Sequence, residues 1–183
     1  MNKIRYFTFC FLFCSIFVAS CKHNGAQQKY IDYLQAVENK INQLQESNQN
    51  QVIENQSVYL GIDSLDLMDF KQVVANHLFF FFFSEETCSP CIQQTVTYVK
   101  EVFPDYETDD RIYFISPTCP ARFRRNYYGK KLLNLENGTL GMSLEAENVP
   151  FIFTVSNDLV VEKVHVVNKS NFDKTLEFLK TFN

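Results

Sequence analysis

Two cysteines separated by two residues, Cys88 and Cys91, are the side chains of this 183-residue chain best suited to chemistry. Such a pair can cycle between dithiol and disulfide, form a structural disulfide, or supply two ligands to a metal. A disulfide across so short a loop would add little stability through loop entropy. Zinc needs four nitrogen or sulfur ligands, and the further candidates Cys119, His77 and His165 match no zinc spacing. The pattern therefore favours a redox dithiol, with copper bound by a third thiol as an alternative.

A buried strand and a helix are predicted to position the dithiol. Five consecutive phenylalanines, Phe79–Phe83, precede it, and a continuous apolar run is typical of a parallel strand covered on both faces. Residues 88–103 then show apolar side chains at helical spacing. Unpaired N–H groups and a partial positive charge at the start of that helix would stabilise a Cys88 thiolate, with Cys91 one turn further on. Pro90 is tolerated because the first helical turn needs no N–H donors.

The other segments complete a predicted α/β fold with a central mixed sheet flanked by helices and an N-terminal helical extension. Its core should be dense in aromatic side chains, because the chain has 19 Phe and nine Tyr but no Trp. In chain order the predicted elements are a strand at 57–62, a turn and short helix at 63–76, the phenylalanine strand, the helix at 88–103, a strand at 111–117, one helix within 118–148, two strands within 149–167 joined by a turn at Asn157–Asp158, and a helix at 171–182.

The first 21 residues predict a secretory signal. Lys3 and Arg5 form a basic head, residues 6–20 are uncharged and mostly apolar, and small residues precede Cys21. The apolar stretch is too short to span a bilayer comfortably as a helix. The tetrapeptide "VASC" resembles the bacterial lipobox, which implies cleavage before Cys21 and attachment of a lipid such as palmitate to it. An ordinary signal peptide or a weak membrane anchor are the alternatives.

The signal divides the chain into a lipoprotein signal peptide at 1–20, a tether and helical stalk at 21–56, and a folded domain at 57–183. Residues 22–29 are polar and are predicted to be a flexible tether. The apolar residues that follow have the 4-3-4-3 spacing of a narrow helical stripe, which suits a stalk, a helix packed on its own domain, or a dimer contact. The stripe consists of Tyr30, Leu34, Val37, Ile41 and Leu44.

Charge and thiol count narrow the possible functions. Loss of the signal would remove two of the 17 basic residues and none of the 21 acidic ones, which leaves 15 against 21, or −6. Nucleic-acid binding normally needs a basic footprint and is therefore not predicted. Besides a lipidated Cys21, the mature chain would retain Cys88, Cys91 and Cys119. Three thiols in an oxidising compartment leave at least one unpaired or catalytic.

Four features of residues 57–183 resemble the thioredoxin superfamily, specifically its membrane-tethered envelope branch of the TlpA/ResA type. They are the apolar strand that leads into "CSPC", the preceding "DSLDLMDF", the segment "NVPFIFTV", and the C-terminal hairpin and helix. The resemblance implies a thioredoxin-like fold and a lipid-anchored thiol:disulfide oxidoreductase. In such an enzyme Cys88 attacks, Cys91 resolves the mixed disulfide, and a cis bond between Val149 and Pro150 faces the dithiol and the client.

The resemblance also implies partners and location. Clients would be disulfide-bearing proteins of the bacterial cell envelope, and a membrane donor or acceptor would exchange electrons with the protein, which would face the periplasm. No cofactor is expected beyond the redox-active disulfide of Cys88 and Cys91, and no metal. Cys119 would be a third, resolving thiol or a spectator. The alternative function is a non-catalytic thioredoxin-fold adaptor or a copper-binding lipoprotein.

Several residues around the dithiol depart from the family pattern. Thr87 stands where the family usually has Trp, Phe82 where thioredoxins have a buried acid, and Gln94 where the TlpA type often has Glu. The resolving thiol therefore lacks the expected carboxylate to relay its proton. Glu85 and Glu86 precede the helix and should oppose the attacking thiolate. These departures predict a slow or reducing enzyme and not a strong oxidant.

Overall fold

The computed structural model describes residues 2–61, 67–117, 128–130 and 132–183, with side chains from residue 25 onward. The chain forms two compact units, Met1–Asn42 and Gln43–Asn183. The first consists of most of helix α1, which spans Asn2–Asn48. Residues 22–29, predicted as a flexible tether, are helical instead. The physical reason is that this segment contains one glycine, no proline and several good helix formers, so nothing in it ends a helix.

The second unit is built around one mixed sheet with the strand order β2-β1-β5-β4-β3-β6-β7. Among the described residues, no helix is both long enough and apolar enough to cross a membrane. The elements after α1 are β1 (Ser57–Leu60), β2 (Leu67–Asp69), α2 (Phe70–Val74), β3 (Phe79–Phe82), α3 (Ser89–Val102), β4 (Ile112–Ser116), β5 (Leu132–Leu135), the 3₁₀ helix η2 (Ser143–Glu147), β6 (Phe151–Val155), β7 (Val161–Val166) and α4 (Phe172–Lys180).

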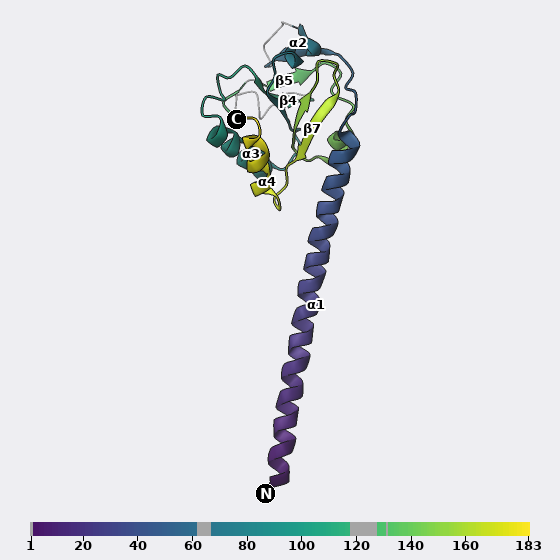
Figure 1. Cartoon of the computed structure of the whole chain (residues 1–183), viewed down its shortest axis with the longest axis vertical. Helices are drawn as coiled ribbons and strands as arrows, with labels where there is room; N and C mark the ends of the chain where they lie inside the picture. Colours follow the sequence, from purple (N-terminus) through teal and green to yellow (C-terminus); the bar gives the residue numbers. More distant parts are fainter. Residues whose placement is uncertain (1, 62–66, 118–127, 131) are drawn as a thin grey trace. The chain divides into compact units, whose positions relative to one another are not determined.

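The centre of the sheet is parallel and its flanks are antiparallel. Strand β3 runs parallel to β4, and β4 runs parallel to β5. Strand β6 is antiparallel to β3 and to β7, and β1 is antiparallel to β5 and to β2. Helices α3 and α4 lie together beside the sheet, and α2 lies elsewhere at its margin (Figure 1). The predicted α/β fold class with a central mixed sheet, flanking helices and an N-terminal helix is confirmed.

The phenylalanine run forms an interior strand of the sheet, β3, which lies between β4 and β6, and the buried strand predicted there is confirmed. All five rings are at most 2% exposed, because helices and loops cover both faces of β3. Phe79, Phe81 and Phe83 pack in the cluster that contains the buried faces of α3 and α4. Phe80 faces the other way and contacts Phe70 of α2, with ring centroids 5.4 Å apart. Burying each ring contributes about 1.5–3 kcal/mol before the entropy of folding is counted.

Two predicted segments differ from the structure. The stretch 118–148, predicted to hold one helix, contains the 3₁₀ helix η2 in its described part and also strand β5, which the sequence did not indicate. Four residues, "LLNL", carry too few positions to show any period, and both faces of β5 are buried. The turn and short helix predicted at 63–76 contain α2, but also the three-residue strand β2, which pairs with β1. Residues 62–66, 118–127 and 131 lie outside the described part.

An asparagine- and glutamine-rich segment, 45–53, covers the outer edge of β7. The Gln45 side-chain oxygen accepts a hydrogen bond from the Val166 N–H at 2.8 Å. The Val161 N–H donates to the Gln51 carbonyl at 2.9 Å, and the Asn50 N–H donates to the Val161 carbonyl at 2.8 Å. These bonds supply partners to an edge strand, which would otherwise present unpaired backbone groups. The compact unit accordingly begins at Gln43, before the position 57 expected from the sequence.

Candidate redox site

The register of three neighbouring strands brings the predicted site residues to one edge of the sheet. Phe82 of β3 pairs with Phe151 of β6, and Phe151 pairs with Val166 of β7. Because these neighbours are antiparallel, the segments that follow β3, precede β6 and follow β7 all leave the sheet at the same edge. Cys88 follows β3 and Pro150 precedes β6. The fold therefore places the dithiol and the proline loop at a common edge.

The two thiols are adjacent at the start of α3. Cys88 is the N-cap residue, and its carbonyl accepts hydrogen bonds from the N–H groups of Cys91 and Ile92 at 3.0 and 3.1 Å. The Cys91 thiol donates to the Cys88 sulfur across 2.9 Å. Cys91 is 4% exposed and belongs to the buried cluster of α3, whereas Cys88 is partly exposed. One accessible thiol thus lies directly beside one shielded thiol.

The surroundings separate the acidities of the two thiols. Partial burial raises the pKa of Cys88, but hydrogen bonds from the Cys91 thiol and backbone N–H, together with the charge of Lys169, lower it by more. The net pKa of Cys88 is therefore below its ordinary value. Burial raises the pKa of Cys91 to about 12, and the hydrogen bond to Cys88 and the charge of that neighbour add to the effect. Cys88 is the thiol that ionises first.

The two carboxylates before the helix are not among the groups that set the pKa of Cys88. Glu85 and Glu86 are both exposed, where water and salt screen their charge. Among the described residues, the charge that acts on Cys88 is the cation of Lys169. The sequence provided no signal for this lysine, because its place at the site depends on the pairing of β6 with β7.

Buried threonine hydroxyls support the dithiol from both sides. Thr87, at the position where the family usually has Trp, is buried, and its hydroxyl oxygen accepts the Ser84 N–H at 2.9 Å. The Thr87 N–H in turn donates to the Ser84 carbonyl at 3.2 Å, which closes the turn before Cys88. One turn into α3, the hydroxyl of fully buried Thr95 donates to the Cys91 carbonyl at 2.8 Å.

No carboxylate is buried near the resolving thiol. Among the described side chains, no Asp or Glu is buried, and Gln94 is half-buried. Phe82 is 2% exposed and packs its ring on Phe151, with centroids 4.6 Å apart. The position where thioredoxins carry an acid is therefore filled by an aromatic stack.

The predicted cis bond before Pro150 is wrong, because no described peptide bond is cis. The trans isomer of a bond before proline is favoured by about 0.5–1 kcal/mol when nothing enforces the other. Pro150 is buried and Val149 is half-buried. The Pro150 carbonyl accepts the Val167 N–H at 2.9 Å, so the loop before β6 is bonded to the loop after β7.

Three other sequence candidates are Cys119, Cys21 and His77. Cys119 lies outside the described residues, and Cys21 lies in α1. His77 bridges backbone groups, with Nδ1 2.6 Å from the Val74 carbonyl and Nε2 accepting the Val155 N–H at 3.1 Å. Within residues 25–61, 67–117, 128–130 and 132–183, no three His, Cys, Asp or Glu side chains are grouped to hold a metal ion.

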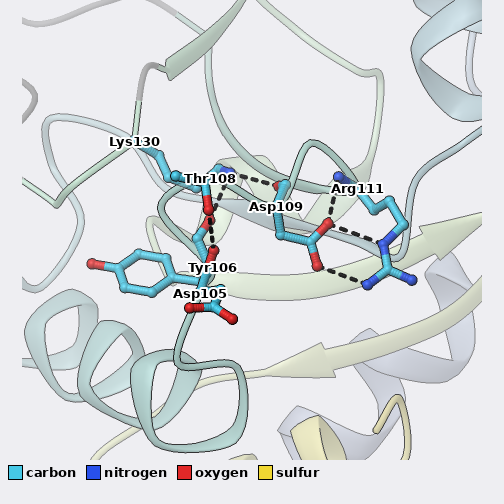
Figure 2. Close-up of polar contacts among 6 residues, drawn as sticks. All are labelled: Asp105, Tyr106, Thr108, Asp109, Arg111 and Lys130. Atoms are coloured by element: carbon cyan, nitrogen blue, oxygen red, sulfur yellow. Dashed lines mark hydrogen bonds and ion pairs between the residues drawn. The ribbon is translucent and has the colours of Figure 1, made fainter.

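Lys130 joins two segments that are distant in the sequence. The Lys130 ammonium group donates to the carbonyls of Tyr106 and Asp109, both at 2.7 Å, and Figure 2 shows it inserted into the turn that follows α3. Asp109 forms an ion pair with Arg111 at 2.8 Å beside it (Figure 2). Neighbouring Tyr128 packs edge-on against Phe83, with centroids 5.6 Å apart. The strand that leads to the dithiol is thereby held from a distant segment.

Comparison with known proteins gives similarity in three dimensions only. No protein-family model matches the chain, and no curated protein matches it. A putative thiol:disulfide interchange protein DsbE from Chlorobium tepidum is similar with a TM-score of 0.45 and 8% identity, covering 71% of this chain and 98% of that one. A thioredoxin-like protein from Porphyromonas gingivalis has a TM-score of 0.47 and 15% identity, with coverages of 74% and 93%. Peroxidoxin BcpB from Mycobacterium tuberculosis has a TM-score of 0.44 and 12% identity, with coverages of 74% and 98%. With TM-scores below 0.5 and identities of at most 15%, these similarities do not establish the chemistry of this chain.

Proposed function

We propose that this protein is a thiol:disulfide oxidoreductase in which Cys88 attacks a client disulfide and Cys91 resolves the product. The observation that carries the proposal is the pair of unlike thiols at the start of α3. One is accessible with a lowered pKa, and the other is buried with a pKa near 12, across 2.9 Å. A low pKa supplies the thiolate that attacks, and a shielded neighbour limits the escape of mixed disulfides.

The reaction consists of two exchanges. The Cys88 thiolate attacks one client sulfur, which forms a mixed disulfide and releases the other client sulfur as a thiolate. Formation of that bond removes the negative charge from Cys88, and with it one of the causes that raise the pKa of Cys91. The released client thiolate takes the Cys91 proton, since no carboxylate is buried among the described side chains. Cys91 then attacks the Cys88 sulfur, which leaves the client with two electrons and the protein with a disulfide. The reverse sequence oxidises a client.

The proposed location is the bacterial cell envelope, with the chain anchored through a lipid on Cys21 and the sheet unit facing the periplasm. The basic, apolar and small-residue order that ends at Cys21 supports this part. The finer assignment to a TlpA/ResA-type lipoprotein is proposed with it. Clients would be disulfide-bearing envelope proteins, and a membrane donor or acceptor would restore the starting redox state.

Insulin reduction with a thiol donor tests the activity. Cys88→Ser should abolish turnover, and Cys91→Ala should leave a client trapped in a mixed disulfide with Cys88. Cys119→Ser makes the same kind of change at the remaining thiol of the mature chain, and unchanged turnover would exclude a third resolving thiol. Full insulin reduction by the Cys88→Ser variant would refute the proposal, as would stoichiometric copper binding by a protein without turnover.

A further inference from the structure

We propose that Lys169 is a positioning residue of the dithiol site, whose ammonium group stabilises the Cys88 thiolate and favours client disulfides flanked by acidic residues. The inference rests on the proposed function and extends it to the class of client. It concerns the loop Val167–Asn171, which connects β7 to α4. Lysine 169 is the basic residue of this loop.

Strand register places the loop at the edge of the sheet that carries the dithiol. Val166 is the last residue of β7 and lies in the same row of paired residues as Phe82, the last residue of β3. Lys169 is three residues beyond Val166, at the edge where the chain turns toward Cys88. Between them, Val167 is fully buried in the cluster that contains Cys91. The lysine therefore lies two residues beyond a residue that packs in the same core as the resolving thiol.

The loop is held in place by two asparagines. The Asn168 N–H donates to the Asn171 side-chain oxygen at 2.9 Å, and the Asn171 amide donates to the Val166 carbonyl at 3.1 Å. The Asn168 side-chain oxygen accepts the Ser170 N–H at 2.6 Å. Asn171 is the N-cap residue of α4, yet its side chain caps no helical N–H. A polar side chain that normally caps a helix is used here to fix the loop on which Lys169 stands.

The charge of Lys169 reaches both thiols. It lowers the pKa of Cys88 and also that of Cys91, and among the described residues no other Lys or Arg acts on either thiol. The side chain is exposed, so a client can approach it. Among the described residues, Lys169 forms no ion pair, and its charge is not neutralised locally. A client carboxylate next to the attacked disulfide would gain from this cation before and during the exchange.

Two small disulfides of different charge distinguish the two parts of this proposal, stabilisation of the Cys88 thiolate and attraction of anionic clients. The probes are the dianionic dithiobis(nitrobenzoate) and the neutral dithiodipyridine, each of which accepts two electrons from the dithiol and releases two thiol products. The ratio of their rates with the same variant cancels the thiolate fraction and reports attraction alone. Titration of the Cys88 thiolate absorbance reports stabilisation alone. A unit charge roughly 6 Å away across water changes an equilibrium by about threefold.

In the full-length protein in detergent, Lys169→Gln should lower the rate ratio of anionic to neutral probe by about threefold or more and should raise the pKa of Cys88. Lys169→Arg should retain both values. Lys180→Gln, which makes the same charge change in the last turn of α4, is the matched control and should leave both unchanged. Added salt should bring the wild-type ratio down to that of Lys169→Gln.

The proposal fails if either the ratio or the thiolate titration of Lys169→Gln equals the wild-type value, or if Lys180→Gln moves them equally. Client reduction is measured separately on the wild type and on Cys88→Ser. Absence of reduction that depends on Cys88 would contradict the proposed function, whereas the thiolate titration would still decide the role of Lys169.

Discussion

His165 makes the stability of the sheet unit depend on pH. Its ring is 7% exposed, its Nε2 lies 2.9 Å from the Thr175 hydroxyl, and it stacks on Phe178 with centroids 4.9 Å apart. Burial, with a smaller effect of the Lys174 charge, lowers the pKa of His165 from 6.5 to about 4. The neutral ring therefore belongs to the folded state and the protonated ring to the unfolded one.

The sign of the effect follows from which state binds the proton. Between pH 6.5 and about 4 the unfolded chain is protonated at this position and the folded chain is not, so acidification favours unfolding. The contribution of His165 is complete above pH 6.5 and is lost as the pH falls to about 4. The two pKa values differ by about 2.5, which corresponds to about 3 kcal/mol in the free energy of unfolding.

Urea unfolding followed by circular dichroism at a series of pH values measures this contribution. The free energy of unfolding of the wild type should fall by about 3 kcal/mol more than that of His165→Gln as the pH decreases from 7 to 4. The comparison uses the slope with pH, so any constant loss of stability in the variant cancels. His77, whose pKa burial also lowers, acts in both proteins and cancels as well. Parallel curves for the two proteins would refute the reasoning.

Two further outcomes follow from the contacts around the site. Lys130→Met removes both hydrogen bonds to the Tyr106 and Asp109 carbonyls and should lower the free energy of unfolding by about 1–3 kcal/mol. The urea midpoint measures this loss. Lys100→Met, at an exposed position of α3, is the control and should change the free energy of unfolding little. Iodoacetamide at pH 8 should modify Cys88 and spare Cys91 in the folded protein, whereas both thiols should be labelled in urea. Mass analysis of the peptides identifies the labelled cysteines. Equal labelling of the two thiols in the folded protein would contradict the burial and the raised pKa of Cys91.

The local part of the site could be predicted from the sequence, and the part that depends on strand register could not. The phenylalanine run and the thiols that follow it are neighbours in the chain, and Pro90 marks the first helical turn. The sequence therefore indicates the strand, the loop and the start of the helix. Lys169 is far from the thiols in sequence and reaches the site only through the pairing of Phe82, Phe151 and Val166. Neither the amino-acid composition nor the hydrophobic periodicity of the sequence indicates that strand pairing.

Other differences have equally specific causes. Strand β5 has only four residues, and the side chains on both of its faces are buried, so its sequence "LLNL" shows no alternation. The bond before Pro150 was predicted from resemblance alone, and isomer choice leaves no mark in the residues on either side. The segment 45–53 looked like a polar end to a stalk, whereas its amides satisfy the backbone of β7.

That segment has a practical consequence for handling the protein. Residues 50–53 behave as a surrogate outer strand, with Val52 bridging Val160 in antiparallel fashion. A fragment that starts at Ser57 would keep every residue of the dithiol site but would expose the unpaired backbone groups of the edge strand β7. Exposed edge strands pair with strands of neighbouring molecules. We expect that fragment to self-associate in solution, while one that starts at Gln43 stays dispersed.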